Sequence, residues 1–107
     1  RIAEVVLIRA EARAQQDKLA LGLADLNLIR DRAGIATSTA ATKNDLLLAI
    51  ENERRVEFAL EPHRWYDIVR TGRAPVVFNL SDANRYVLPI PVQQLLSDKA
   101  LEQNPGY

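Results

Sequence analysis

Hydrophobic residues recur every three or four positions from residue 2 to about residue 60, which is the period of an α-helix. The spacing predicts a helix over residues 2–16 and a second over residues 19–33, which Gly34 ends. The link from Gln16 to Lys18 is short, and short links favour antiparallel helix pairs. We therefore expect a helix hairpin of about 34 residues, the length of one tetratricopeptide unit. Most of that unit's Trp, Gly, Tyr and Pro markers are missing.

A polar loop is predicted over residues 35–43, followed by a third helix from Asp45 to Leu60. Thr42 stands three positions before Asp45, which resembles a capping box, and Asn44 is an alternative cap. The apolar face of this helix is broad at its start and is interrupted later by charged residues.

Beyond Leu60 the pattern predicts one more helix and then a change of structure. Pro62 ends or kinks the third helix, and a short fourth helix is expected over residues 63–70. Thr71 and Gly72 close it.

The segment from Arg73 onward favours extended structure. Residues 74–80 and 85–91 are apolar or proline-rich, and residues 81–84 have turn chemistry, so the two runs could pair as a small β-hairpin. Residues 92–96 suit one or two helical turns, and residues 103–107 form an irregular tail. The predicted fold is mainly α: a tetratricopeptide-like helix hairpin, two further helices, a short extended or β-hairpin segment and the tail.

Length and composition narrow the class of protein. The 107 residues suffice for one small domain with one core. The 14 basic and 14 acidic residues cancel, and no basic run of the kind that nucleic-acid binders carry is present. No apolar stretch approaches the length of a membrane span, and there is no cysteine for a disulfide, a thiolate metal site or a nucleophile.

Residues 51–72 combine a high density of charge with the chain's only His and only Trp. Apolar residues alternate with the charges, so some of the charged groups must lie against the core, where they need partners. Two interpretations follow: an active site or a structural ion network.

An active site would use Glu53 and Glu57, which lie four apart on one helix face, with His63 soon after. The spacing is wrong for a His-Glu-x-x-His zinc site, a lone His is a poor metal anchor, and no phosphate-binding loop or nucleophile elbow is present. The neighbouring arginines would keep the carboxylates ionised and paired. We therefore assign no catalytic, cofactor-binding or metal-binding residue, and we expect a structural network that pins the third helix to the fourth. It consists of Glu53, Arg54, Glu57, Arg64 and Asp67.

Sugar binding is a further possibility, because aromatic rings stack on pyranose faces. Trp65 lies three positions before Ile68 and is expected to pack inward, whereas Tyr66 is equally compatible with core packing and with ligand contact. Tyr66 is thus the candidate glycan-contacting residue.

Five motifs, in order along nearly the whole chain, resemble the C-terminal region of the SusD/RagB family. They are Arg1-x-Ala3-Glu4-x-x-Leu7-Ile8-Arg9-Ala10-Glu11-Ala12, Leu26-Asn27-x-Ile29-Arg30-x-Arg32-Ala33-Gly34, Glu53-Arg54-Arg55-x-Glu57-Phe58-x-x-Glu61-x-His63-Arg64-Trp65-x-Asp67-x-x-Arg70-Thr71-Gly72, Leu88-Pro89-Ile90-Pro91 and Gln103-Asn104-Pro105-Gly106-Tyr107. Two departures concern residues 73–96. A Glu that often follows the Pro-Ile-Pro segment is replaced by Val92-Gln93-Gln94, and the stretch before that segment is shorter than in the family.

The resemblance implies a non-catalytic protein that binds glycans or other nutrients. Family members are lipid-anchored on the outer-membrane surface of Bacteroidetes-type bacteria and pass their ligand to a TonB-dependent transporter. The resemblance carries no cofactor and no ligand residue over to this chain. It also implies that residues 1–107 form one C-terminal SusD-like domain of a longer polypeptide, because the chain starts inside a helical pattern and lacks the family's lipidated Cys.

Two other functions remain open from the residues alone. One is a helical-repeat scaffold that binds protein partners. The other is a glycan-processing enzyme that uses Glu53 or Glu57. Because the first helix lacks a cap and neighbours to pack against, we also expect the isolated chain to be marginally stable or to self-associate.

Overall fold

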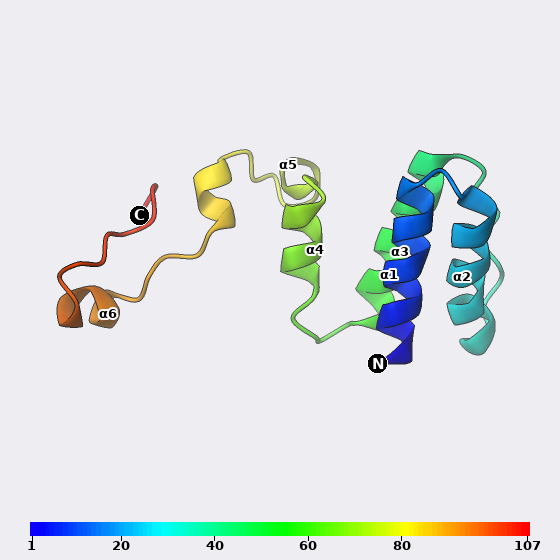
Figure 1. Ribbon diagram of the computed structural model, residues 1–107, viewed down its shortest axis with the longest axis horizontal. Helices are drawn as coiled ribbons and strands as arrows, with labels where there is room; N and C mark the ends of the chain where they lie inside the picture. Colours follow the sequence, from blue (N-terminus) through cyan, green and yellow to red (C-terminus); the bar gives the residue numbers. More distant parts are fainter. The chain divides into compact units, whose positions relative to one another are not determined.

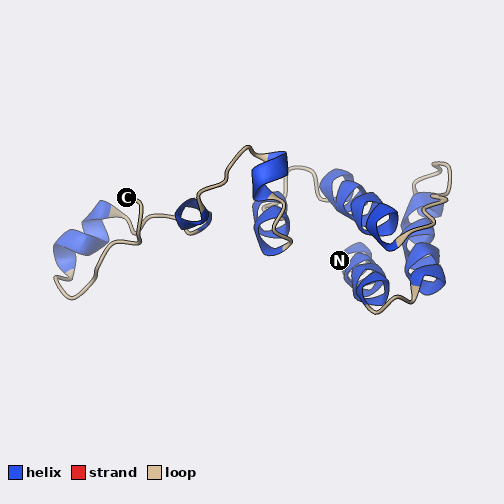
Figure 2. Ribbon diagram, turned by 90° about the horizontal axis from the view of Figure 1, so that it is seen from above, coloured by secondary structure: helices blue, strands red, loops and turns tan.

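The structure is a computed structural model that describes all residues from 1 to 107. Its regular elements are all helices, joined by loops, and it contains no β-strand (Figure 2). The chain forms two compact units, residues 1–64 and residues 65–107. Each unit is described by itself.

Three helices make up the first unit: α1 (Ile2–Gln15), α2 (Leu19–Arg32) and α3 (Lys43–Glu57). Figure 1 shows α1 and α2 side by side and antiparallel, as their short link predicted, and each of the three helices contacts the other two. The buried apolar core lies between them and consists of Ala3, Leu7, Ala10, Ala14, Leu26, Ile29, Leu46, Ile50 and Phe58. The tetratricopeptide likeness of the helix pair stays a prediction.

Small residues bring α1 and α2 close together. A Cβ atom added at Gly22 would lie 3.0 Å from the carbonyl oxygen of Ala10, 3.2 Å from Leu46 Cδ2 and 3.4 Å from the amide nitrogen of Ala14. Gly22 weakens α2 as an isolated helix by about 1 kcal/mol relative to Ala. Its place in the helix follows from packing, because it lets the two backbones approach.

The start of α3 confirms the predicted cap. Thr42 Oγ1 accepts a hydrogen bond from the Asp45 amide at 3.1 Å and donates to Asp45 Oδ2 at 2.7 Å. The helix ends at Glu57, three residues earlier than the sequence predicted. Leu60 adopts a φ of +67°, a left-handed conformation that a helix cannot contain, so the chain has already turned before Pro62.

The second unit contains α4 (Arg64–Arg70), α5 (Ala74–Val77), the 3₁₀-helix η1 (Ala83–Tyr86) and α6 (Val92–Ser97). Ile68 and Ala74 are its buried apolar residues. Trp65 stacks on Phe78, with ring centroids 5.7 Å apart and planes tilted by 14°. The predicted inward packing of Trp65 thus takes the form of a half-buried aromatic pair.

The β-hairpin expected over residues 74–80 and 85–91 is wrong. Pro75 lies in the first turn of α5, where its fixed φ suits a helix and its missing N–H costs nothing. Residues 83–86 form a 3₁₀ turn, which the side chain of Asp82 caps by accepting from the Asn84 amide. What remains of the second expected strand is an extended segment over residues 87–91, and it has no strand partner.

No helix combines the length and the apolar character that crossing a bilayer requires.

Replacing Gly22 with Ala tests the close approach of α1 and α2. We expect Gly22→Ala to lower the free energy of unfolding by about 1–3 kcal/mol, because the added methyl group overlaps the backbone of α1. Helix propensity alone would make Gly22→Ala stabilising. Ala20→Gly, at an exposed position of α2, measures the size of that propensity effect in this helix. Urea denaturation measures both variants, and an increase in stability for Gly22→Ala would contradict the packing described.

Candidate functional site

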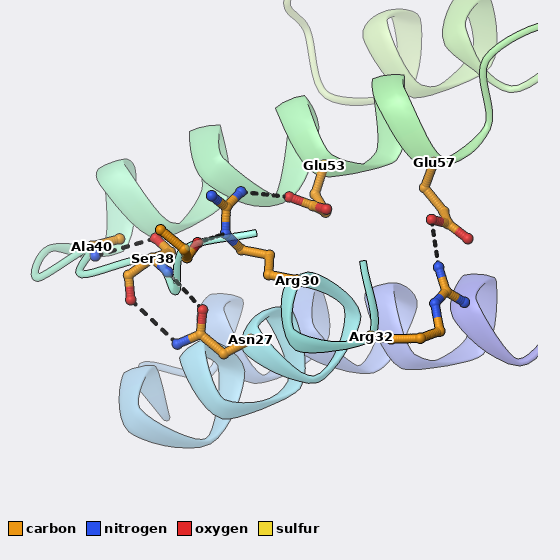
Figure 3. Close-up of polar contacts among 8 residues, drawn as sticks. Asn27, Arg30, Arg32, Ser38, Ala40, Glu53 and Glu57 are labelled. Carbon is orange, nitrogen blue, oxygen red and sulfur yellow. Dashed lines mark hydrogen bonds and ion pairs between the residues drawn. The ribbon is translucent and has the colours of Figure 1, made fainter. Parts of the chain in front are cut away.

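Two carboxylates of the charged block of residues 51–72, Glu53 and Glu57, pair with arginines of α2. Arg30 Nη1 donates to Glu53 Oε2 at 2.8 Å, and the same guanidinium donates through Nε to the carbonyl oxygen of Ala36 at 2.7 Å (Figure 3). The Glu53 side chain is only 8% exposed, so its charge needs this partner. One arginine thereby joins α2, the loop after it and α3.

Glu57 makes a second, more exposed connection between the same helices. Arg32 Nη2 donates to Glu57 Oε2 at 2.7 Å (Figure 3). The backbone carbonyl of Glu57 accepts from Arg1 Nη2 at 3.0 Å, which attaches the start of α1 to the end of α3.

These contacts correct the expected partners of two members of the network, Glu53 and Glu57. The sequence suggested that the network pins the third helix to the fourth, and the pair of Arg64 and Glu51 has that form, with Arg64 Nη1 3.3 Å from Glu51 Oε1. Asp67 accepts from Arg70 within α4, at 2.8 and 3.0 Å. Glu53 and Glu57 instead face α2. Helix α3 packs against both α1 and α2, so the side of α3 that carries these two residues lies against α2.

Arg54 lies buried against an aromatic ring. Its guanidinium carbon is 5.1 Å from the centroid of Phe58, and that of Arg1 is 5.3 Å from the same ring. His63 packs against Phe58 as well, with ring centroids 4.7 Å apart. Phe58 is thus the apolar centre against which two guanidinium groups and the His63 ring lie, and its face stabilises the buried guanidinium of Arg54.

A further ion cluster escaped prediction from the sequence. Asp25, 2% exposed, accepts from Arg9 Nε at 3.0 Å, from Arg9 Nη2 at 2.8 Å and from Arg13 Nη1 at 2.7 Å. The hydrogen bonds and the charge of Asp25 raise the pKa of Arg9 above its ordinary value. The available signal was the helical spacing of Gly22, Asp25, Leu26 and Ile29, which places Asp25 on the buried face of α2.

The loop after α2 is also fastened to that helix. Asn27 Nδ2 donates to the carbonyl oxygen of Ser38 at 3.2 Å, and the Ser38 amide donates to Asn27 Oδ1 at 2.7 Å (Figure 3). Ser38 Oγ accepts from the Ala40 amide at 3.4 Å. Together with Arg30, these bonds hold the loop in one conformation.

Glu53 and Glu57 therefore have little freedom to act as an acid and a base. Each is bonded to a guanidinium, and the closest carboxylates to His63 are those of Glu4 and Glu61, at 3.9 and 3.5 Å. No three His, Asp or Glu side chains gather in a metal-binding arrangement. The contacts of Glu53 and Glu57 with arginines are ion pairs between helices.

The two aromatic candidates differ in exposure. Trp65 is half-buried against Phe78, whereas Tyr66 is 63% exposed on α4. Tyr66 remains the candidate for contact with a ligand.

Comparison with known proteins identifies the family. The sequence profile of the SusD family matches residues 1–82, about three quarters of the chain. The chain belongs to the SusD family. Two SusD-like proteins from Formosa agariphila, P2 and P38, are 34% and 30% identical over the whole of this chain. The chain spans about a quarter of the length of these relatives.

Solved structures of SusD-like proteins share the fold. A crystal structure of a SusD-like protein from Bacteroides fragilis matches the whole chain with a TM-score of 0.82 at 29% identity, over 25% of that protein. A SusD superfamily protein from Bacteroides vulgatus matches with a TM-score of 0.89 at 24% identity, over 26% of its chain, and this likeness shows the fold alone.

In this SusD family chain, the buried cluster around Asp25 should matter more for stability than the exposed pair at Glu57. We expect Asp25→Asn to lower the free energy of unfolding by about 2–3 kcal/mol, because two guanidinium groups lose their buried counter-charge. Glu57→Gln should cost less than about 1 kcal/mol, since its partner Arg32 is largely exposed. Chemical denaturation measures the free energy of unfolding of both variants. A larger loss for Glu57→Gln than for Asp25→Asn would contradict this order.

Proposed function

We propose that this chain serves as scaffold in a non-catalytic protein that binds a glycan or another nutrient at the bacterial cell surface. The observation that carries the proposal is the occupation of the charged block by structural ion pairs, in a chain that belongs to the SusD family. Its three-helix unit is fastened by arginines at several points, which suits a part that supports a binding surface.

Accessibility argues against catalysis by the two glutamates. A general acid or nucleophile must lie within hydrogen-bond reach of the substrate. The Glu53 side chain is 8% exposed and Glu57 is 15% exposed, and an arginine occupies each carboxylate. A sugar would have to displace Arg30 from the buried Glu53 and Arg32 from the more exposed Glu57.

The proposed location and partners come from the family. We propose attachment to the outer membrane through a lipid anchor, exposure at the cell surface and delivery of the bound nutrient to a TonB-dependent transporter. Tyr66 is the proposed contact with a sugar ring, because it exposes an aromatic face beside the charged groups of α4. No cofactor is needed for this role.

One observation favours a second function, a helical scaffold that binds protein. Val5 and Ile8 are 65% and 52% exposed on the side of α1 away from the core, and the exposed Ala12 continues their row. This spacing of three and four positions is the one by which helices pack against one another. The row would suit a further helix, including that of a second copy.

The proposed function is tested by measuring ligand binding and glycan cleavage with the whole protein, as its gene encodes it. We expect a glycan array to show binding without cleavage of any bound glycan. Glu53→Gln should leave binding unchanged while lowering the free energy of unfolding by about 1–3 kcal/mol, because the Arg30 guanidinium loses its buried counter-charge. Tyr66→Ala should weaken binding without changing stability.

Two outcomes would contradict the proposal. Glycan cleavage that Glu53→Gln abolishes at unchanged stability would establish an enzyme instead. The absence of any glycan, peptide or other nutrient ligand would leave no binding role.

Sedimentation of the 107-residue chain tests the exposed row of α1. We expect self-association at micromolar concentration, because the row presents apolar surface that a partner helix can cover. Ile8→Glu should shift the chain toward monomer, whereas Leu28→Glu, at a similarly exposed position on α2, should have a smaller effect. A stable monomer at all concentrations would contradict this expectation.

A further inference from the structure

The end of the second unit is ordered without a hydrophobic core. From residue 79 to residue 107 no side chain is buried. Burial of apolar surface, which normally fixes a chain, therefore contributes little to this part. The extended segment over residues 87–91 is nonetheless held by a specific set of hydrogen bonds.

Gln103 supplies the central contacts. Its Oε1 accepts from the Ile90 amide at 2.8 Å, and its Nε2 donates to the carbonyl oxygen of Ile90 at 3.0 Å. This pair of bonds is the pair that a residue of a neighbouring antiparallel strand would make. Gln103 Oε1 also accepts from the Asn104 amide at 2.9 Å, which fixes the orientation of the side chain.

Two more side chains of the tail bind the same segment. Asn104 Nδ2 donates to the carbonyl oxygen of Leu88 at 2.7 Å, and the Tyr107 hydroxyl donates to that of Val87 at 3.1 Å. The side chains of Gln103, Asn104 and Tyr107 thus bind three of the five residues of the extended segment.

The backbone of the tail is fitted to the preceding 3₁₀ turn. Gly106 has a φ of +92°, which L side chains rarely adopt, and a Cβ atom there would lie 3.1 Å from Asn84 Cβ. A larger residue would push the tail off η1 and carry Tyr107 away from Val87. Glycine is therefore required here both by backbone conformation and by space.

We propose that residues 103–107 act as a clasp, a strap of side chains that takes the place of a partner strand for residues 87–91. The prolines of the segment explain why side chains do this. Pro89 and Pro91 have no N–H, so a regular backbone ladder along the segment would be interrupted at both positions. Side-chain amides are not tied to the two-residue period of a strand, and they can bind the groups that remain.

The clasp makes the conformation of residues 87–91 depend on the last five residues of the chain. Release of the clasp leaves the segment without these four bonds, and no buried side chain nearby replaces them. The clasp lies within the second unit, and it is independent of the nutrient-binding role proposed above.

Amide hydrogen exchange on the 107-residue chain tests the clasp directly. The Ile90 amide should exchange slowly relative to the Leu88 amide, which donates to no atom of the clasp. Gln103→Leu should accelerate exchange at Ile90 about tenfold, because both bonds to that residue are lost. Gln93→Leu, on the exposed face of α6, is the matched control and should leave Ile90 unchanged. Unchanged exchange at amides of α1–α3 verifies that each variant is folded.

Two further variants separate the clasp from a general loss of order. Gln103→Glu keeps an acceptor for the Ile90 amide and removes the donor, so its effect should be smaller than that of Gln103→Leu. Gly106→Ala should accelerate exchange at Ile90, whereas Gly72→Ala, at a φ of +70° with nothing within 4 Å, should not. The proposal is overturned if exchange at Ile90 is as fast as at Leu88 in the unaltered chain. It is equally overturned if Gln103→Leu and Gln93→Leu give the same rate.

Discussion

The bond between Arg30 and Glu53 is the contact on which the arrangement of the first unit depends. A carboxylate that is almost fully buried must have a cationic partner, and Arg30 provides it while also binding the backbone of the loop between α2 and α3. The position of α3 relative to α2 and the path of the connecting loop are thereby set by one guanidinium. The pair formed by Arg32 and Glu57 and the bonds of Asn27 to Ser38 reinforce the same arrangement.

This constraint also explains why a charged block that looks like an active site serves structure. Catalytic carboxylates need access to substrate and freedom to change protonation. Here Glu53 and Glu57 form ion pairs that join α3 to α2, and Asp25 forms ion pairs that join α2 to α1. The chain belongs to the SusD family, and Tyr66, which is 63% exposed, stays the proposed ligand contact.

Local signals in the sequence predicted most of the fold. The period of the apolar residues gave the first three helices, and Thr42 with Asp45 gave the start of α3. The β-hairpin failed because Pro75 suits a helix start as well as an extended chain, and nothing local distinguishes the two. The partners of Glu53 and Glu57 lie 23 and 25 residues away, so only the packing of α2 on α3 determines them. The prediction of a single domain over residues 1–107 stays a prediction.

A double-mutant cycle on Arg30 and Glu53 tests the central claim most directly. The free energy of unfolding would be measured for the unaltered chain, Arg30→Ala, Glu53→Ala and the double variant. If the pair is the structural joint described, the coupling energy should be about 1–3 kcal/mol. A coupling energy below about 0.3 kcal/mol, with the two single effects simply adding, would contradict the account.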